Sequence, residues 1–138
     1  MPSDKSEPIW LDRLVLDAVH WDQVREHGGL PGIRDENSLE AALARPRQKW
    51  IYGRRVDHAT LAAAYGFGIV RGHPYRDGNK RIAFLAMAIF TELDGWVLEV
   101  GEAEVVKMML ALAAGELTEA RLAAWVRRHL VRCDDRGD

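Results

Sequence analysis

The sequence has only one cysteine, Cys133, among its 138 residues. A single thiol excludes an internal disulfide, and chains without disulfides are typical of a reducing cytosol. Charge of one sign is also missing, since the formal net charge is -2. No overall charge therefore favours a nucleic-acid or membrane partner, and we expect neither as a direct partner.

Long apolar runs are absent as well. Residues 82–90 have no polar side chain, but the run is far shorter than the ~20 residues that span a membrane. Residues 1–8 are too polar to contain the apolar core of a signal peptide. We therefore expect a cytoplasmic protein.

The chain also lacks linkers, repeats and low-complexity stretches. With 48% hydrophobic residues it suits one globular domain that buries a real core. We predict a flexible N-terminal tail over residues 1–8, a domain over 9–132 and a polar C-terminal tail over 133–138.

Apolar residues recur at helical spacing through most of the domain. Asp35 or Asn37 is expected to cap the second helix, Arg45-Pro46 to end it, and Asp57 to cap the third. The predicted helices cover residues 11–27, 38–44, 58–71, 78–93, 102–114 and 118–130. Six helices with short connections predict an all-α compact bundle. The fourth helix is apolar on every side, which places it at the centre.

Residues 47–56 differ from the helical segments around them. Trp50, Ile51 and Tyr52 favour β-structure and stand beside Gly53, so the stretch predicts a small hairpin flap that docks a target, or a loop pinned by Trp50. Another short extended piece is expected at 96–100. We assign His20 and His27, in or near the first helix, to packing or surface roles.

A polar stretch, residues 72–81, leads directly into the central helix. The first N–H groups of a helix have no intrahelical partner, and the helix dipole is positive there. Lys80 and Arg81 are unfavourable at such an end unless an anion binds. A phosphate-binding cradle is therefore one interpretation of this stretch.

The same stretch supplies the parts of phosphoryl or nucleotidyl transfer. His73 is a titratable base, Asp77 is a ligand for a hard cation such as Mg²⁺, and Gly78 lets backbone approach an anion. A Walker A loop is excluded by the spacing of the glycines and by the ending. Two alternatives stay open: His73 and Asp77 share a transition metal, or they brace a helix entry while Lys80 and Arg81 are merely solvated.

Residues 73–81 resemble the signature of the Fic/Doc family, His-x-Phe-x-Asp/Glu-Gly-Asn-x-Arg, in the variant of the Doc (death on curing) toxins, where Lys precedes the final Arg. The one departure is Tyr75 in place of Phe. Gly32-Ile33-Arg34-Asp35 and residues 39–46 are similar to the same family, and the resemblance covers about residues 9–131. It implies the Fic/Doc fold.

The resemblance also implies roles for individual residues. His73 would deprotonate a target hydroxyl, Tyr75 would anchor the loop in the core, and Asp77 would hold Mg²⁺. The residues implied to bind the phosphates of ATP are Gly78, Asn79, Lys80, Arg81 and Arg71.

Lys80 bears on the type of reaction. Fic proteins that transfer AMP have Gly at this position, and a long cation there would favour another orientation of ATP. The Doc-like variant implies transfer of the γ-phosphate to a threonine of elongation factor Tu, which arrests translation. Gly78, by contrast, resembles the AMP-transferring proteins, so protein adenylyltransferase is the alternative. The second alternative is a catalytically idle Fic-fold protein that acts only by binding.

A protein that arrests translation needs an inhibitor. Fic proteins often carry an inhibitory Ser/Thr-x-x-x-Glu-Gly/Asn helix; here Ser3 and Glu7 have the spacing, but Pro8 follows. The resemblance therefore implies inhibition in trans by a cognate Phd-like antitoxin, whose disordered tail folds on the toxin. It also implies a bacterial toxin-antitoxin module.

Overall fold

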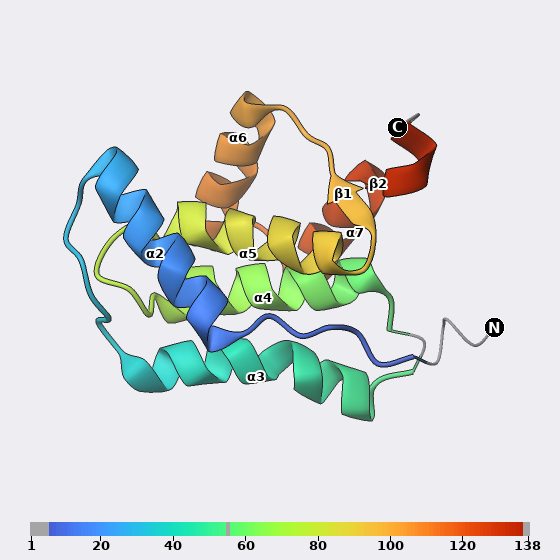
Figure 1. The fold of residues 1–138 in the computed structure, drawn as a ribbon, viewed down its shortest axis with the longest axis horizontal. Helices are drawn as coiled ribbons and strands as arrows, with labels where there is room; N and C mark the ends of the chain where they lie inside the picture. The colour runs from blue at the N-terminus through green and yellow to red at the C-terminus, as the bar shows by residue number, and fades with distance from the viewer. Residues whose placement is uncertain (1–5, 55, 137–138) are drawn as a thin grey trace.

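The computed structural model describes residues 6–54 and 56–136. Residues 1–5 and 137–138 of the two predicted tails, and position 55 of the predicted flap, lie outside the described residues. The described helices are α2 (Arg13–His27), α3 (Glu36–Tyr52), α4 (His58–Gly72), α5 (Asn79–Leu93), α6 (Glu102–Ala113) and α7 (Glu119–His129). The prediction of a mostly helical bundle with six helices is confirmed (Figure 1).

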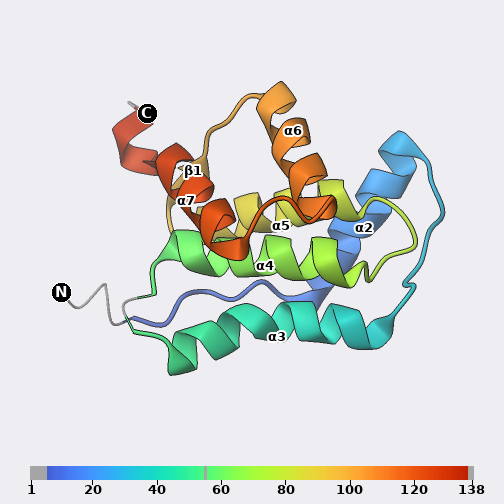
Figure 2. The ribbon, with the colours of Figure 1, turned by 180° about the vertical axis from the view of Figure 1, so that it is seen from behind.

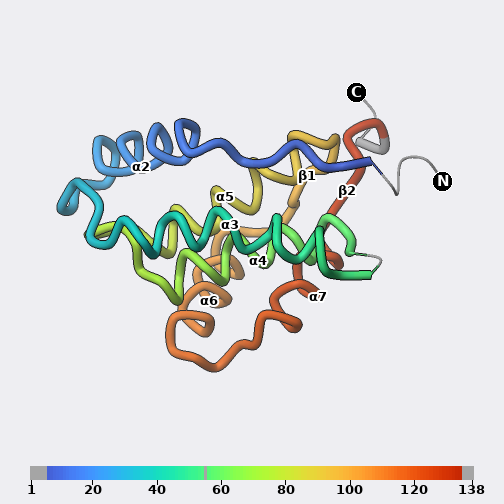
Figure 3. Tube along the Cα trace, turned by 90° about the horizontal axis from the view of Figure 1, so that it is seen from below, coloured from blue at the N-terminus to red at the C-terminus, as the bar shows by residue number. Residues whose placement is uncertain are grey.

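The helices form three layers. Helices α3, α4 and α5 make the middle layer, with α2 and the extended N-terminal segment on one side and α6 and α7 on the other (Figure 3). Helix α7 lies across α4 on the face turned toward the viewer in Figure 2. The core contains side chains from every layer, and its largest fully buried members include Trp125, Tyr65, Tyr75 and Phe90.

Helix α4 shares the centre with the predicted central helix, α5. It contacts α3, α5, α6 and α7, and its small residues make this possible because they let neighbouring backbones approach closely. A Cβ on Gly66 would lie only 2.6 Å from the Sδ atom of Met87 on α5. The predicted cap is confirmed, since the carboxylate of Asp57 accepts from the N–H of Thr60 at 2.9 Å.

Helix α3 is longer than predicted. Arg45-Pro46 does not end it, and Pro46 lies inside a helix that continues to Tyr52. An internal proline costs about 3 kcal/mol, but Leu39, Ala42 and Pro46 are buried at helical spacing against α4. This packing outweighs the local penalty. The predicted hairpin or loop is therefore wrong over residues 47–52, which are the last turns of α3, whereas Gly53 and Arg54 lie outside helices and strands.

A small sheet closes the domain near its C-terminal end. The predicted extended piece is β1 (Trp96–Leu98), which pairs antiparallel with β2 (Leu130–Arg132), with Val97 opposite Val131. The last helix stops one residue before its predicted end, at His129, and β2 was not predicted. A 3₁₀ turn, η1 (Cys133–Arg136), follows, and the N–H of Cys133 donates to the carbonyl of Gly95 at 3.0 Å.

The described N-terminal segment runs extended along one side of the layer formed by α3, α4 and α5 (Figures 1 and 3). Pro8 is buried, and the ring of Trp10 stacks on Phe90 with centroids 6.1 Å apart. The N–H of Leu11 donates to the hydroxyl of Tyr65 at 2.9 Å. Pro8, the last residue of the predicted tail, is thus packed in the domain, whereas Ser6 and Glu7 are exposed. Across the described ranges, none of the helices has the length and apolar character needed to cross a membrane.

Candidate active site

The loop between α4 and α5 carries the polar stretch identified in the sequence. Helix α4 ends at Gly72, and His73 follows in the left-handed conformation with φ 52°. Gly78, also left-handed with φ 79°, then precedes the first residue of α5. The loop from His73 to Gly78, called the motif loop below, therefore turns sharply at both ends.

Tyr75 and Asn79 hold the motif loop in the core. Tyr75 is fully buried, and its ring stacks on His20 of α2 with centroids 4.6 Å apart. The amide of Asn79 clasps the backbone of Tyr75, because its Oδ1 accepts from the N–H at 3.0 Å and its Nδ2 donates to the carbonyl at 2.8 Å. Tyr75 thus occupies an anchoring position, and Asn79 can offer an anion only its backbone N–H.

The hydroxyl of Tyr75 is the unusual feature of this anchor. It is the one buried side-chain polar atom in the described part of the chain that lacks a hydrogen-bond partner. Burial, aided by the nearby carboxylate of Asp17, raises the pKa of Tyr75 well above its ordinary value. The family signature has Phe here, which has no hydroxyl to satisfy.

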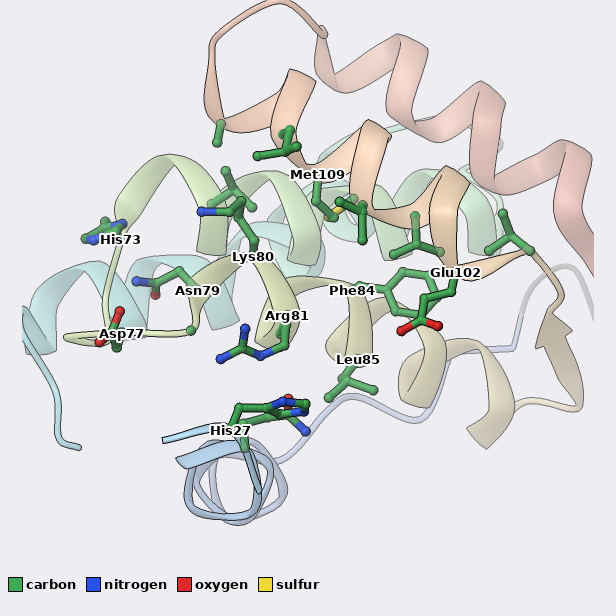
Figure 4. A pocket seen from close by; sticks show the side chains of 18 residues that line it. His27, His73, Asp77, Asn79, Lys80, Arg81, Phe84, Leu85, Glu102 and Met109 are labelled. Atoms are coloured by element: carbon green, nitrogen blue, oxygen red, sulfur yellow. The ribbon is translucent and has the colours of Figure 1, made fainter. Parts of the chain in front are cut away.

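A cleft of about 860 Å³ opens beside the motif loop, between α2, α5 and α6. Figure 4 shows His73, Asp77, Lys80 and Arg81 gathered at one end, and Phe84 and Glu102 toward the other. The second end is mostly apolar, with side chains from α5 and α6. The residues that line this apolar half are Phe84, Leu85, Val100, Val105, Val106, Met109, Leu110 and Ala113.

The polar half of the cleft is suited to an anion. The start of α5 has no side-chain cap, and its first intrahelical bond runs from the N–H of Ile82 to the carbonyl of Gly78. The N–H groups of residues 79–81 therefore remain available. Lys80 and Arg81 are exposed, and no ion pair to either is found within residues 6–54 and 56–136. Two unpaired cations at a positive dipole end strongly favour a phosphate-bearing ligand.

Asp77 and Glu102 are the carboxylates that line the cleft, and Asp77 lies at the same end as these cations (Figure 4). Its Oδ2 accepts from the N–H of Leu30 at 3.1 Å, and within the described ranges it makes no ion pair. The same ranges hold no cluster of three or more His, Cys, Asp or Glu side chains that could bind a metal. One carboxylate does fit Mg²⁺, which is commonly held by one or two carboxylates together with substrate phosphates.

Other predicted site residues lie apart from the cleft. The guanidinium of Arg71 lies over the ring of Phe67, 5.7 Å from its centroid, and Arg71 does not line the cleft. Trp50, Ile51, Tyr52 and Gly53 lie at the C-terminal end of α3, whereas the N-terminal end of α3 adjoins the motif loop. A helix of 17 residues separates the two by about 25 Å.

The sequence reasoning missed the contribution of α2 and α6 to the cleft. Gln23 and His27 line it from α2, although His27 had been assigned a packing or surface role. Their i, i+4 spacing was the available signal, but which face of α2 meets the motif loop depends on tertiary packing. On α6, Val106 and Leu110 are each about half exposed, which their helical spacing does not predict.

The model of the Fic/DOC family matches residues 10–91, and the chain belongs to the Fic/DOC family. It is 30% identical to "Protein kinase doc" of Escherichia phage P1 over 113 residues, which cover 82% of this chain and 89% of that protein.

Proposed function

We propose that this protein is the toxin of a toxin-antitoxin module, a kinase that transfers the γ-phosphate of ATP to a hydroxyl of a translation factor. One observation carries the proposal. An uncapped helix start with two unpaired cations, Lys80 and Arg81, shares one cleft with His73 and Asp77. This combination provides phosphate binding, a base and a ligand for Mg²⁺ within one site.

The proposed reaction is an in-line displacement. His73 accepts the proton of a serine or threonine hydroxyl, and the hydroxyl oxygen forms a bond to the γ-phosphorus. The bond between that phosphorus and the β,γ-bridging oxygen breaks, and ADP leaves. Lys80, Arg81 and the N–H groups at the start of α5 stabilise the charge on the phosphate oxygens. Asp77 would hold Mg²⁺, which when bound neutralises phosphate charge.

Lys80 supports phosphoryl transfer over AMP transfer. Its side chain enters the cleft beside the start of α5, where AMP-transferring relatives have only a glycine hydrogen. The name of the phage P1 relative, a protein kinase, points the same way. Gly78 favours the alternative, protein adenylyltransferase, so the experiment below measures the mass of the transferred group.

Elongation factor Tu is the first target to test, with a threonine as the expected acceptor, following the resemblance to Doc-like toxins. Modification of this factor would arrest translation and growth. Ile51 and Tyr52 are exposed at the end of α3 and remain candidates for docking the target, together with Trp50 and Gly53. Because they lie far from His73, docking there requires a target that extends along α3.

The apolar half of the cleft would receive the antitoxin. Val106 and Leu110 on α6 are each 53% exposed beside Phe84, and such a groove accepts the apolar face of a helix. A peptide seated there would lie against the polar half and obstruct ATP. Leu110→Glu should therefore abolish neutralisation by a co-expressed antitoxin. Leu14→Glu, which changes an exposed leucine on α2 outside the cleft, should leave neutralisation intact.

Intact-mass spectrometry of purified elongation factor Tu tests the proposed function. After incubation with the protein and Mg²⁺-ATP, we expect a gain of about 80 Da, one phosphoryl unit, and no gain with the His73→Ala variant. A gain of about 329 Da would establish AMP transfer and overturn the kinase proposal. No gain on this or any other translation factor would favour the binding-only alternative.

A further inference from the structure

Residues 29–34, called the bracing segment below, lie between α2 and α3 and make a series of bonds to the motif loop. The carbonyl of Pro74 accepts from the N–H of Arg34 at 2.7 Å, and the carbonyl of Gly32 accepts from the N–H of Arg76 at 3.0 Å. Ile33 and Tyr75 form an antiparallel bridge. The motif loop thus takes its shape from a segment about forty residues earlier in the chain.

The side chain of Arg34 closes the end of α4. Its Nε donates to the carbonyl of His73 at 2.6 Å and its Nη2 to the carbonyl of Gly72 at 2.9 Å. The last carbonyls of a helix have no intrahelical donor, so the planar guanidinium supplies two. Both bonds are charge-assisted, which makes them stronger than neutral ones.

These bonds hold the backbone of His73, which has an unfavourable conformation. Within the described ranges, His73 is the only residue other than glycine with a positive φ. The left-handed conformation costs roughly 1–2 kcal/mol for a residue with a Cβ. A contact that fixes the carbonyl of His73 therefore keeps its backbone, and the direction in which its imidazole leaves it, in a conformation that the chain alone disfavours.

The other end of the bracing segment fixes Asp77. The N–H of Leu30 donates to Asp77 Oδ2, and a Cβ on Gly29 would lie 3.0 Å from the same oxygen and 3.3 Å from the Cβ of Asp77. Gly29 thus leaves just the room that the carboxylate occupies. The segment itself is fixed to α2, because the N–H of Gly32 donates to Nε2 of the buried His20 at 3.1 Å.

We propose that the bracing segment is the positioning element of the active site: Arg34 holds His73, and Gly29 with the N–H of Leu30 holds Asp77. This inference rests on the proposed function for the roles of His73 and Asp77. Neither Arg34 nor Gly29 touches the reacting groups, so both are positioning residues. Misplacing a reacting group by 1 Å can cost about 10²-fold in rate.

The first test separates the geometry of Arg34 from its charge. Arg34→Lys keeps the charge but loses the planar fork, and we expect kcat to fall at least about tenfold while KM for ATP stays unchanged. In Arg34→Gln, which loses both the fork and the charge, kcat should fall by at least as much. Arg25→Gln, which removes a surface arginine of α2, is the matched control and should have wild-type kinetics. Full activity in Arg34→Lys would overturn the role of the fork.

A second readout does not depend on transfer. The NMR signals of the His73 ring should shift in Arg34→Lys and remain in place in Arg25→Gln. If the wild-type protein transfers nothing, the proposed function fails, yet these signals still decide the inference. Unchanged His73 signals in a folded Arg34→Lys variant would overturn the positioning of His73.

Gly29 has a matched control in its neighbour. Both Gly28 and Gly29 have positive φ, 77° and 98°, but a Cβ on Gly28 would meet nothing within 4 Å. We expect Gly29→Ala to raise about tenfold the Mg²⁺ concentration that gives half of the ATP-induced rise in Tm, as is typical for groups that orient a metal ligand. Gly28→Ala also places a Cβ at a positive φ, but away from Asp77, and should not raise this Mg²⁺ concentration. Equal Mg²⁺ dependence in the two variants would overturn the positioning of Asp77.

Discussion

The two ends of α4 are built in opposite ways. At the N-terminal end, Asp57 caps the helix and also accepts from Arg127 of α7 at 2.7 Å, so charges and polar groups are paired locally. At the C-terminal end, His73 is held in a strained conformation by Arg34, and Lys80 and Arg81 next to it have no described partner. One end contributes stability, and the other retains unpaired groups that a ligand can use.

The largest expected effect comes from removing the base at the C-terminal end. His73→Ala should lower transfer to the target by about 10²–10⁴-fold, the usual contribution of general base catalysis. The rate of transfer and the Tm of the variant should both be measured. The Tm should hardly change, because the imidazole of His73 is exposed and has no described hydrogen bond. Retained transfer in this variant would contradict the assignment of His73.

The strain at His73 can be measured by comparing two inactive variants. His73→Gly should be more stable than His73→Ala by about 1 kcal/mol, because glycine adopts the left-handed conformation without the Cβ penalty. Urea unfolding of both variants checks this difference. Equal stability would mean that no strain is stored at this position, and the contrast between the ends of α4 would weaken.

The two buried tyrosines extend the same comparison to the core. The hydroxyl of Tyr65 accepts from the N–H of Leu11, whereas that of Tyr75 has no described partner. Tyr65→Phe leaves a buried N–H unsatisfied and should lower the free energy of unfolding by about 1–3 kcal/mol. Tyr75→Phe should be neutral or slightly stabilising. Chemical unfolding of both variants measures these free energies. A large decrease in the free energy of unfolding of Tyr75→Phe would reveal a hydrogen-bond partner for the Tyr75 hydroxyl.

The smallest expected effect concerns pH at the N-terminal end. Burial raises the pKa of Asp57, but hydrogen bonds from Arg127 and Thr60 outweigh this and lower it to about 2 from 3.8. A depressed pKa contributes stability above pH 4 that is lost as pH falls from about 4 to 2. Asp57→Asn keeps a cap but loses the charge, and because the pair is half-exposed it should cost less than about 1 kcal/mol at pH 7. The difference in the free energy of unfolding between Asp57→Asn and the wild-type protein should vanish near pH 2. A difference that stays constant with pH would contradict the pairing of Asp57 with Arg127.

The fold could largely be predicted because the local signals agree with it. Asp35 and Asp57 cap helices as expected, and Gly28 ends α2 with a positive φ. The exception is α3, where Pro46 and the β-formers that follow predicted an end. The segment makes tertiary contacts that a local pattern does not contain: Trp50 meets Trp10 edge-on, and Lys49 pairs with Glu119 of α7.

The site was predictable only in part, for a similar reason. Residues 73–81 are contiguous, so their chemistry can be recognised directly in the sequence. Arg34 and Leu30 reach the motif loop through tertiary hydrogen bonds, and His20 stacks on Tyr75. Nothing in the spacing of these residues predicts which atoms they meet. Asn79 also illustrates the limit, because its amide serves the loop backbone and leaves only its N–H for an anion.

The central claim is that the unpaired cations at the start of α5 bind the phosphates of ATP, and calorimetric titration tests it most directly. Mg²⁺-ATP should bind the wild-type protein. The double variant Lys80→Gln/Arg81→Gln should bind at least about 100-fold more weakly, since two lost charged hydrogen bonds at about 1.5–3 kcal/mol each weaken binding by about 3–6 kcal/mol. A control that removes two exposed charges outside the cleft, Arg25→Gln/Lys107→Gln, should bind like wild type. Undiminished binding by the Lys80→Gln/Arg81→Gln variant would contradict the claim.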